Sequence, residues 1–264
     1  MTAGAVRVGI GGWTYEPWRG GVFYPEKWPQ KRELEYASRA LTAIEINGTY
    51  YSSFKPASYA AWAACVPKGF VFTLKASRYC TNRKVLAEAG EAAARFVGQG
   101  IVELGDKLGP ILWQFMATKK FDAGDFGAFL KLLPTAHAGV ALRHAVQVRH
   151  DSFAVPEFVT MCRDAGVAIA YGRSDSYPAI ADVTGDFVYA RLECATQDQP
   201  LGYAEADLDR WATAAKSWAG GETPEHLPLI APPAPVRPRE TFVFFIGGAK
   251  ERNPAAARAL IERL

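Results

Sequence analysis

Three basic side chains stand close to the ends of separate apolar runs. Lys75 follows the third such run, Arg149 follows the fifth, and Arg191 lies near the end of the seventh. In a parallel barrel the strand ends face one mouth, and side chains of one layer come from alternate strands, so these three are expected to converge. With one nearby glutamate they would carry surplus positive charge, which a phosphate or carboxylate would balance. The alternative is that each cation is a solvated charge at a strand end or pairs with Glu45, Glu193 or Asp175.

Glu45, in the second apolar run, is the candidate general acid or base of this mouth. Asn47 shares its strand face, because side chains alternate along a strand, and Gln114 closes the fourth run. Both would orient a ligand, and Tyr50 would stack on it or donate a hydrogen bond. The alternatives are a structural carboxylate that pairs with Lys75 and a tyrosine that only packs.

Two further features could complete the mouth. Gly247 and Gly248 follow the eighth run and would let the backbone approach a ligand, next to the start of the last helix, where free N–H groups favour anions. Lys250 would add charge there. Trp13, in the loop after the first run, could roof the site. The alternatives are an ordinary glycine turn and an aromatic residue that packs within its own loop.

The elements that would position these residues form an α/β pattern. The 264 residues match the usual length of one closed α/β barrel. Eight β-rich runs, most of them separated by enough residues for a helical crossover, are what a parallel sheet requires. They span 6–10, 43–46, 70–74, 110–115, 146–148, 167–170, 187–192 and 242–246. We therefore expect a single (β/α)8 TIM-type barrel with parallel strands over residues 1–264.

Helical patterns fill most of the intervals between these runs. They span 30–41, 57–65, 85–104, 126–133, 156–165, 206–218 and 254–264, the last with Asn253 as its cap. Between 171 and 186 turn residues replace a helical pattern, so the sixth helical unit is expected to be irregular. The proline-rich stretch 228–238 is expected to be an ordered spacer or an insertion on one face.

Several classes of function have no sequence support. A Walker A loop, a GxSxG elbow and a dinucleotide fingerprint are all missing, and the four histidines are scattered, so we expect no metal and no cofactor. A net charge of +3 gives only weak support for nucleic acid as a partner. Charged residues interrupt every apolar stretch, which argues against a membrane partner. The start of the chain has no signal-peptide pattern, and we expect a cytoplasmic protein. Nothing in the sequence specifies an oligomeric state.

The residues near the strand ends, taken in order, resemble those of the YecE-like family, the domain of unknown function seventy-two. The matching stretches are GWTY at 12–15, EINGTYY at 45–51, FTLKAS at 72–77, LGPILWQF at 108–115, VRH at 148–150 and FVYARL at 187–192. The resemblance covers nearly the whole chain and implies a (β/α)8 barrel with a pocket at the strand C-termini. It implies no defined activity.

Four departures from the family pattern lie around the mouth. Gln147 stands where the family usually has a glutamate, and Arg173 where it usually has an aspartate, unless Asp175 takes that place after a shift. Glu193-Cys194 replaces a His-Gly turn, and Gly247–Gly248 replaces two asparagines. The resemblance thus implies that this chain has lost carboxylates and prefers anions more strongly. It also implies altered chemistry or none.

The leading hypothesis is an enzyme-like barrel that binds or acts on a small phosphate- or carboxylate-bearing ligand. Lys75, Arg149 and Arg191 would hold the anion and Glu45 would serve as acid or base. One alternative is a non-catalytic ligand-binding or scaffold barrel. A second alternative is a metal-assisted hydrolase of nucleic acid or sugar phosphate.

Overall fold

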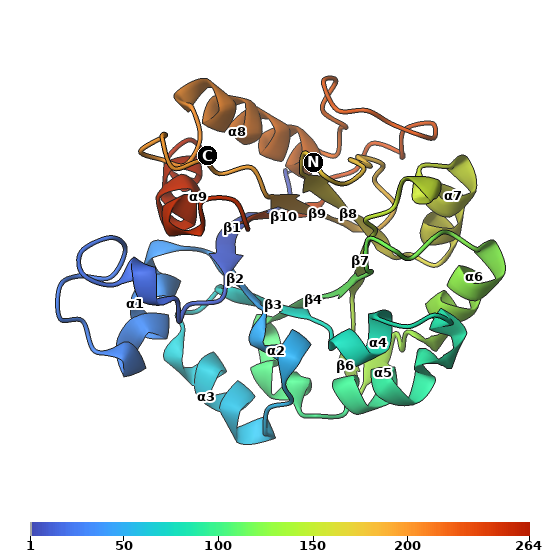
Figure 1. The fold of residues 1–264 in the computed structure, drawn as a ribbon, viewed down its shortest axis with the longest axis horizontal. Helices are drawn as coiled ribbons and strands as arrows, with labels where there is room; N and C mark the ends of the chain where they lie inside the picture. Colours follow the sequence, from blue (N-terminus) through green and yellow to red (C-terminus); the bar gives the residue numbers. More distant parts are fainter. Residues whose placement is uncertain (1) are drawn as a thin grey trace.

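The computed structural model describes residues 2–264 and contains a closed barrel of eight parallel strands (Figure 1). Around the barrel the strand order is β1-β10-β9-β8-β7-β4-β3-β2. The barrel strands are β1 (Val6–Gly11), β2 (Ala43–Ile46), β3 (Val71–Lys75), β4 (Leu108–Gln114), β7 (His144–Gln147), β8 (Ala168–Arg173), β9 (Phe187–Leu192) and β10 (Glu240–Phe245). Each of the eight predicted runs overlaps one of them, so the predicted fold is confirmed. Two short strands, β5 (Ala136–His137) and β6 (Val140–Ala141), form a separate antiparallel hairpin.

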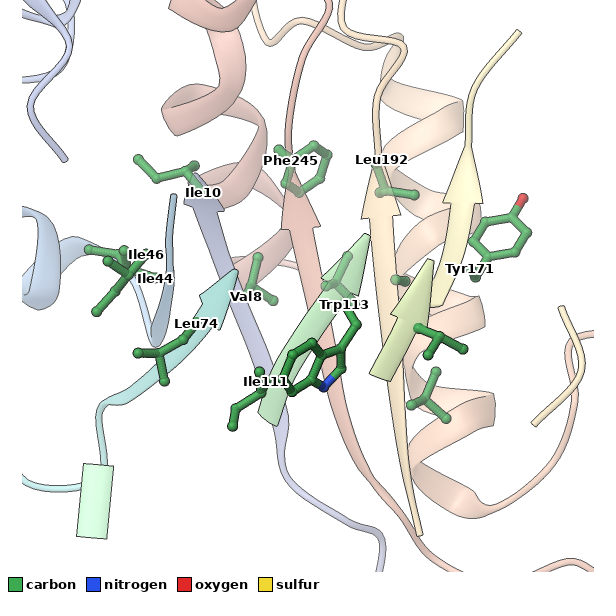
Figure 2. Close-up of a cluster of buried hydrophobic side chains, with 14 of the residues drawn as sticks. Val8, Ile10, Ile44, Ile46, Leu74, Ile111, Trp113, Tyr171, Leu192 and Phe245 are labelled. Carbon is green, nitrogen blue, oxygen red and sulfur yellow. The ribbon is translucent and has the colours of Figure 1, made fainter. Parts of the chain in front are cut away.

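Residues on each strand alternate between the barrel interior and the surrounding helices. In β3, Val71 belongs to the inner apolar cluster, whereas Phe72 and Leu74 belong to the larger outer cluster. The interior is filled mainly by aromatic residues of β9 and β10 packed against alanines of the other strands. Figure 2 shows members of the outer cluster on several strands. This alternation places every second side chain at a strand end inside the mouth.

Helices cover the outside of the barrel (Figure 1). They are α1 (Glu33–Ala40), α2 (Gly48–Tyr51), α3 (Pro56–Cys65), α4 (Arg78–Thr81), α5 (Gly90–Val97), α6 (Ala123–Leu132), α7 (Pro156–Asp164), α8 (Glu205–Gly220) and α9 (Asn253–Ile261). Pro56 and Pro156 start their helices at the first turn, where a missing N–H costs nothing. Asp122 caps α6 by accepting a hydrogen bond from the Asp125 N–H. Within the described chain, no helix has both the length and the apolarity needed to cross a bilayer.

The prediction of a single helix over 85–104 is wrong. The segment is divided into a 3-10 turn η3 (Leu86–Ala89), α5 and a second 3-10 segment η4 (Ile101–Lys107). Gly100, between α5 and η4, has a φ of 107°, a left-handed conformation that stops a helix. A Cβ on Gly100 would overlap Pro56 at the start of α3, so only glycine lets the two segments approach this closely.

The irregular sixth unit is confirmed, because no helix lies between the end of β8 at Arg173 and the start of β9 at Phe187. The proline-rich spacer packs against this region. The Asp182 carboxylate accepts hydrogen bonds from the Ile230 N–H at 2.8 Å and the Ala231 N–H at 2.9 Å. The spacer thus covers a part of the barrel where a helix is missing.

The predicted cap of the last helix is also wrong. Asn253 is the first residue of α9, the preceding Arg252 occupies the cap position, and a 3-10 turn (Lys250–Arg252) leads into it. The Asn253 side-chain amide instead donates a hydrogen bond to the Gly247 carbonyl at 3.3 Å. Asn253 therefore ties the helix to the loop after β10.

Candidate functional site

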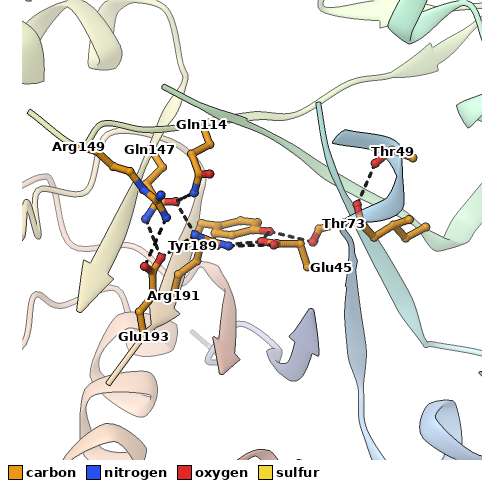
Figure 3. Close-up of polar contacts among 10 residues, drawn as sticks. Glu45, Thr49, Thr73, Gln114, Gln147, Arg149, Tyr189, Arg191 and Glu193 are labelled. Atoms are coloured by element: carbon orange, nitrogen blue, oxygen red, sulfur yellow. Dashed lines mark hydrogen bonds and ion pairs between the residues drawn. The ribbon is translucent and has the colours of Figure 1, made fainter. Parts of the chain in front are cut away.

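Arg191 lies at the centre of a buried polar network inside the C-terminal end of the barrel (Figure 3). Its Nε donates to Glu45 Oε2 at 3.1 Å and its Nη2 to Glu45 Oε1 at 3.2 Å. Its Nη1 donates to Gln147 Oε1 and to Glu193 Oε1, both at 2.6 Å. Burial alone would lower the pKa of Arg191, but the charges of Glu45 and Glu193 outweigh it and the pKa is raised. Arg191 is thus a fully engaged cation.

Glu45, from β2, is completely buried and holds Arg191 in place. Besides the two bonds from Arg191, it accepts a hydrogen bond from the Tyr189 hydroxyl at 2.7 Å. That hydroxyl also lies 2.8 Å from the Thr73 hydroxyl on β3. Burial and the charge of Glu45 raise the pKa of Tyr189 well above its usual value, which keeps the phenol protonated. The Glu45 carboxylate therefore links β2, β3 and β9.

Gln147 and Glu193 close the other side of the network. Gln147 Oε1 accepts a hydrogen bond from Gln114 Nε2 at 2.6 Å. The Nε2 atom of Gln147 donates to Glu193 Oε1 at 3.0 Å. Glu193 Oε2 lies 3.4 Å from Arg149 Nη2. The Arg149 guanidinium also stacks on the ring of Tyr177 at 4.4 Å. Gln114 and Arg149 thus join the network through Gln147 and Glu193.

Lys75 is the last residue of β3. Unlike Arg149 and Arg191, it forms no ion pair with any of residues 2–264. Its ammonium nitrogen lies 4.2 Å from the centroid of the Tyr50 ring, a cation–π contact. Burial lowers the pKa of Lys75 to about 8, and the charges of Arg191 and Arg149 act in the same direction. Glu45 and Glu193 oppose this shift without reversing it.

The structure brings the three cations together with Glu45 and with Glu193, which the sequence offered only as an alternative pairing partner. We call Glu45, Lys75, Arg149, Arg191 and Glu193 the mouth cluster. The expectation of one glutamate among three cations is wrong, because Glu193 also contacts Arg149 and Arg191. Three cations face two carboxylates, so one positive charge is left unmatched. Since Arg191 is paired on both sides and Arg149 on one, Lys75 carries the unmatched charge.

Trp13 and Asn47 lie apart from the network of Arg191. The Trp13 ring packs edge-on against Trp62 of α3 at 5.3 Å and against Phe72, a residue of the outer cluster. Trp13 thus packs the loop after β1 against α3 and β3. Asn47 is partly buried and occupies the N-cap position of α2, without a capping hydrogen bond from its side chain.

The glycine pair after β10 is explained by its own turn. Gly247 and Gly248 have φ values of 75° and 55°, and a Cβ on Gly248 would overlap the carbonyl oxygen of Ala195. The Ala249 N–H donates to the same oxygen at 2.7 Å. Lys250 points its ammonium group at the Tyr15 ring, 4.1 Å away. These residues join the loops after β9 and β10.

No three His, Cys, Asp or Glu side chains of the described chain converge in a way that could hold a metal ion. Both carboxylates of the mouth cluster are already occupied by arginine side chains.

Residues 7–264 match the family described as a protein of unknown function, DUF72. The chain belongs to this family. The YecE-like resemblance is confirmed, since both names denote the same family. Among curated proteins, none matches this DUF72 chain.

Solved structures share the fold of this DUF72 chain. A DUF72 family protein from Thermotoga maritima is 22% identical, with a TM-score of 0.70 and 97% of each chain covered. A DUF72 family protein from Enterococcus faecalis is 15% identical, with a TM-score of 0.69 over 98% of this chain and 97% of that one. The protein named SacUVDE is 8% identical, with a TM-score of 0.54 over 88% and 83%. At these identities the likeness concerns the fold.

The alternative in which the cations pair with Glu45, Glu193 or Asp175 holds for two of them in this DUF72 chain, because Glu193 pairs with both Arg149 and Arg191. The resemblance led us to expect lost carboxylates, with neutral Gln147 in place of a glutamate. Gln147 in fact donates to Glu193, so a carboxylate reaches the same cluster from the end of β9 instead of β7. The alternation along β9 carried the signal, because Tyr189, Arg191 and Glu193 share one strand face.

Proposed function

We propose that this DUF72 chain binds a small ligand bearing a phosphate or carboxylate group at the C-terminal mouth of the barrel. The observation that carries the proposal is the unmatched positive charge of the mouth cluster, held by Lys75. A partly desolvated cation without a carboxylate partner is costly for the protein alone, and an anion supplies the missing charge.

Lys75 and Arg149 are the proposed contacts with the anion. The Arg149 side chain is 22% exposed and has one carboxylate at 3.4 Å, which leaves N–H groups for a ligand. Tyr50 holds the Lys75 ammonium group from one side, and its own hydroxyl accepts a hydrogen bond from Asn82 at 3.1 Å.

Arg191 and Glu45 have a different role in this proposal. Arg191 donates to three partners and Glu45 accepts from two, and both are almost completely buried. We assign both of them to positioning, because they fix β2, β7 and β9 relative to one another beneath the proposed ligand contacts. Gln114 acts with them through Gln147.

The test is the dependence of the melting temperature on inorganic phosphate and, separately, on sulfate. A ligand at ten times its dissociation constant adds about 1.4 kcal/mol of stability. Lys75→Met and Arg149→Met should each weaken this stabilisation at least severalfold. Lys68→Met is the matched control, because Lys68 is an exposed lysine just before the opposite end of the same strand, β3. If all four proteins respond equally to both anions, the proposal is wrong.

A further inference from the structure

We infer that Lys75 is an amine nucleophile that forms a Schiff base with an aldehyde or ketone carrying a carboxylate or phosphate group. This inference rests on the proposed anion site and adds the reactive group and the class of substrate. It begins from the geometry of the lysine side chain.

The backbone of Lys75 is held firmly while its amine is not. The Lys75 carbonyl accepts a hydrogen bond from the Thr49 hydroxyl at 2.7 Å, and the next residue, Ala76, donates its N–H to the Leu112 carbonyl at 2.9 Å. The ammonium group lies over the face of the Tyr50 ring and forms no hydrogen bond or ion pair with residues 2–264. An aromatic face attracts an ammonium ion but accepts no proton from it, so the amine can leave this contact and react.

The surroundings of this amine favour its neutral form, which is the nucleophile. Burial has the largest effect and lowers the pKa of Lys75 to about 8, and two neighbouring arginines contribute. A lysine that is desolvated and placed beside other cations is a recurrent way to activate an amine for attack on a carbonyl. The groups that face it are Tyr50 on α2, Glu45 on β2, Arg149 after β7, and Arg191 and Glu193 at the end of β9.

Two partly buried lysines of the chain lack this combination. Lys119 forms an ion pair with Asp125 at 2.5 Å, so its amine already has a carboxylate partner. Lys250 lies near the Tyr15 and Trp18 rings, and burial lowers its pKa, but no arginine contributes to that shift. Lys75 alone among the three faces a surplus of positive charge.

The reaction is a condensation and needs no oxidant or reductant. The neutral amine attacks the carbonyl carbon, so a C–N bond forms as the C=O π bond breaks, and one amine proton passes to the oxygen to give a carbinolamine. The hydroxyl then leaves with the second amine proton as water, and the C=N bond forms. Arg149 would hold the carboxylate or phosphate of the substrate while the carbonyl carbon reaches Lys75.

Reductive trapping tests this inference on the intact protein. The protein is incubated near pH 7 with pyruvate in one arm and dihydroxyacetone phosphate in the other, reduced with borohydride, and mapped by peptide mass spectrometry. The neutral fraction of an amine with a pKa near 8 exceeds that of an ordinary lysine roughly a hundredfold. Allowing for lower intrinsic nucleophilicity and partial burial, we expect Lys75 to be labelled about tenfold faster than Lys68. Added inorganic phosphate should slow the labelling of Lys75 only.

The outcomes separate this inference from the proposed function. Fast labelling of Lys75 that phosphate suppresses supports both. Labelling of Lys75 no faster than Lys68, in a protein that phosphate stabilises through Lys75, overturns the nucleophile and leaves the anion site standing. Fast labelling that phosphate does not affect supports the nucleophile and counts against the anion site. If neither response occurs, both are wrong.

Discussion

Replacing Arg191 with methionine tests the network at its centre. The substitution removes two hydrogen bonds to Glu45 and one each to Gln147 and Glu193. Glu193 keeps Arg149 as a partner, whereas Glu45 keeps only the hydroxyl of Tyr189. The effect is therefore set by one fully buried carboxylate that loses its cation.

The expected size follows from this burial. Removing one partner of a buried ion pair costs about 3–5 kcal/mol. Since Arg191 is 2% exposed and Glu45 is 0% exposed, solvent screening gives no relief, and we expect Arg191→Met to fall within that range. For a domain of this size, at roughly 2–4 °C per kcal/mol, the melting temperature should fall by roughly 6–20 °C.

The matched control is the double variant Glu45→Gln/Arg191→Met. The glutamine removes the stranded charge and can still accept a hydrogen bond from Tyr189, so the double variant should regain about 2 kcal/mol relative to Arg191→Met. Urea unfolding followed by tryptophan fluorescence measures all four corners of this cycle. A loss below about 1 kcal/mol in the single variant, or a double variant no more stable than it, would refute the ion-pair reasoning.

Three further predictions concern stability and titration. Lys75→Met should be at least as stable as the parent at pH 7, because the pKa of Lys75 is lowered to about 8 in the folded protein from an ordinary value of 10.5. Between these pH values the unfolded chain binds more protons than the folded protein. The free energy of unfolding of the parent should therefore rise by about 1–3 kcal/mol relative to that of Lys75→Met as the pH increases. A difference in urea unfolding that does not change with pH contradicts this. Arg149→Met should shift the pH of half-maximal Lys75 labelling upward, because Arg149 helps to lower that pKa; an unchanged profile would count against the coupling. Gly248→Ala should lower the free energy of unfolding by about 2 kcal/mol or more, because it adds left-handed backbone strain and overlap with Ala195. Gly12→Ala is the control, because Gly12 has a φ of 74° but open space around it, and it should lose about 1 kcal/mol. Equal melting temperatures for the two variants would contradict this reasoning.

The barrel itself could be predicted from local pattern. Each strand is a short β-rich run, and the positions of Lys75, Arg149 and Glu45 at or near strand ends follow from chain order alone. Strand alternation also places Arg191 and Glu193 on one face. Local signals therefore determined which side chains could reach the mouth. They failed at Gly100, where a helical pattern continues through a residue that has a left-handed conformation and packs closely against Pro56, which is distant in the chain.

The pairing of these side chains was decided by tertiary structure. Arg191 and Glu45 are separated by 146 positions in the chain and meet only because the barrel closes. Whether a given arginine is neutralised depends on distances across that closed interior, which no local pattern encodes. For the same reason the sequence placed a surplus of charge at the mouth but could not assign it to Lys75. That assignment required the positions of both carboxylates, because charge interactions in a buried site depend on separation and burial together.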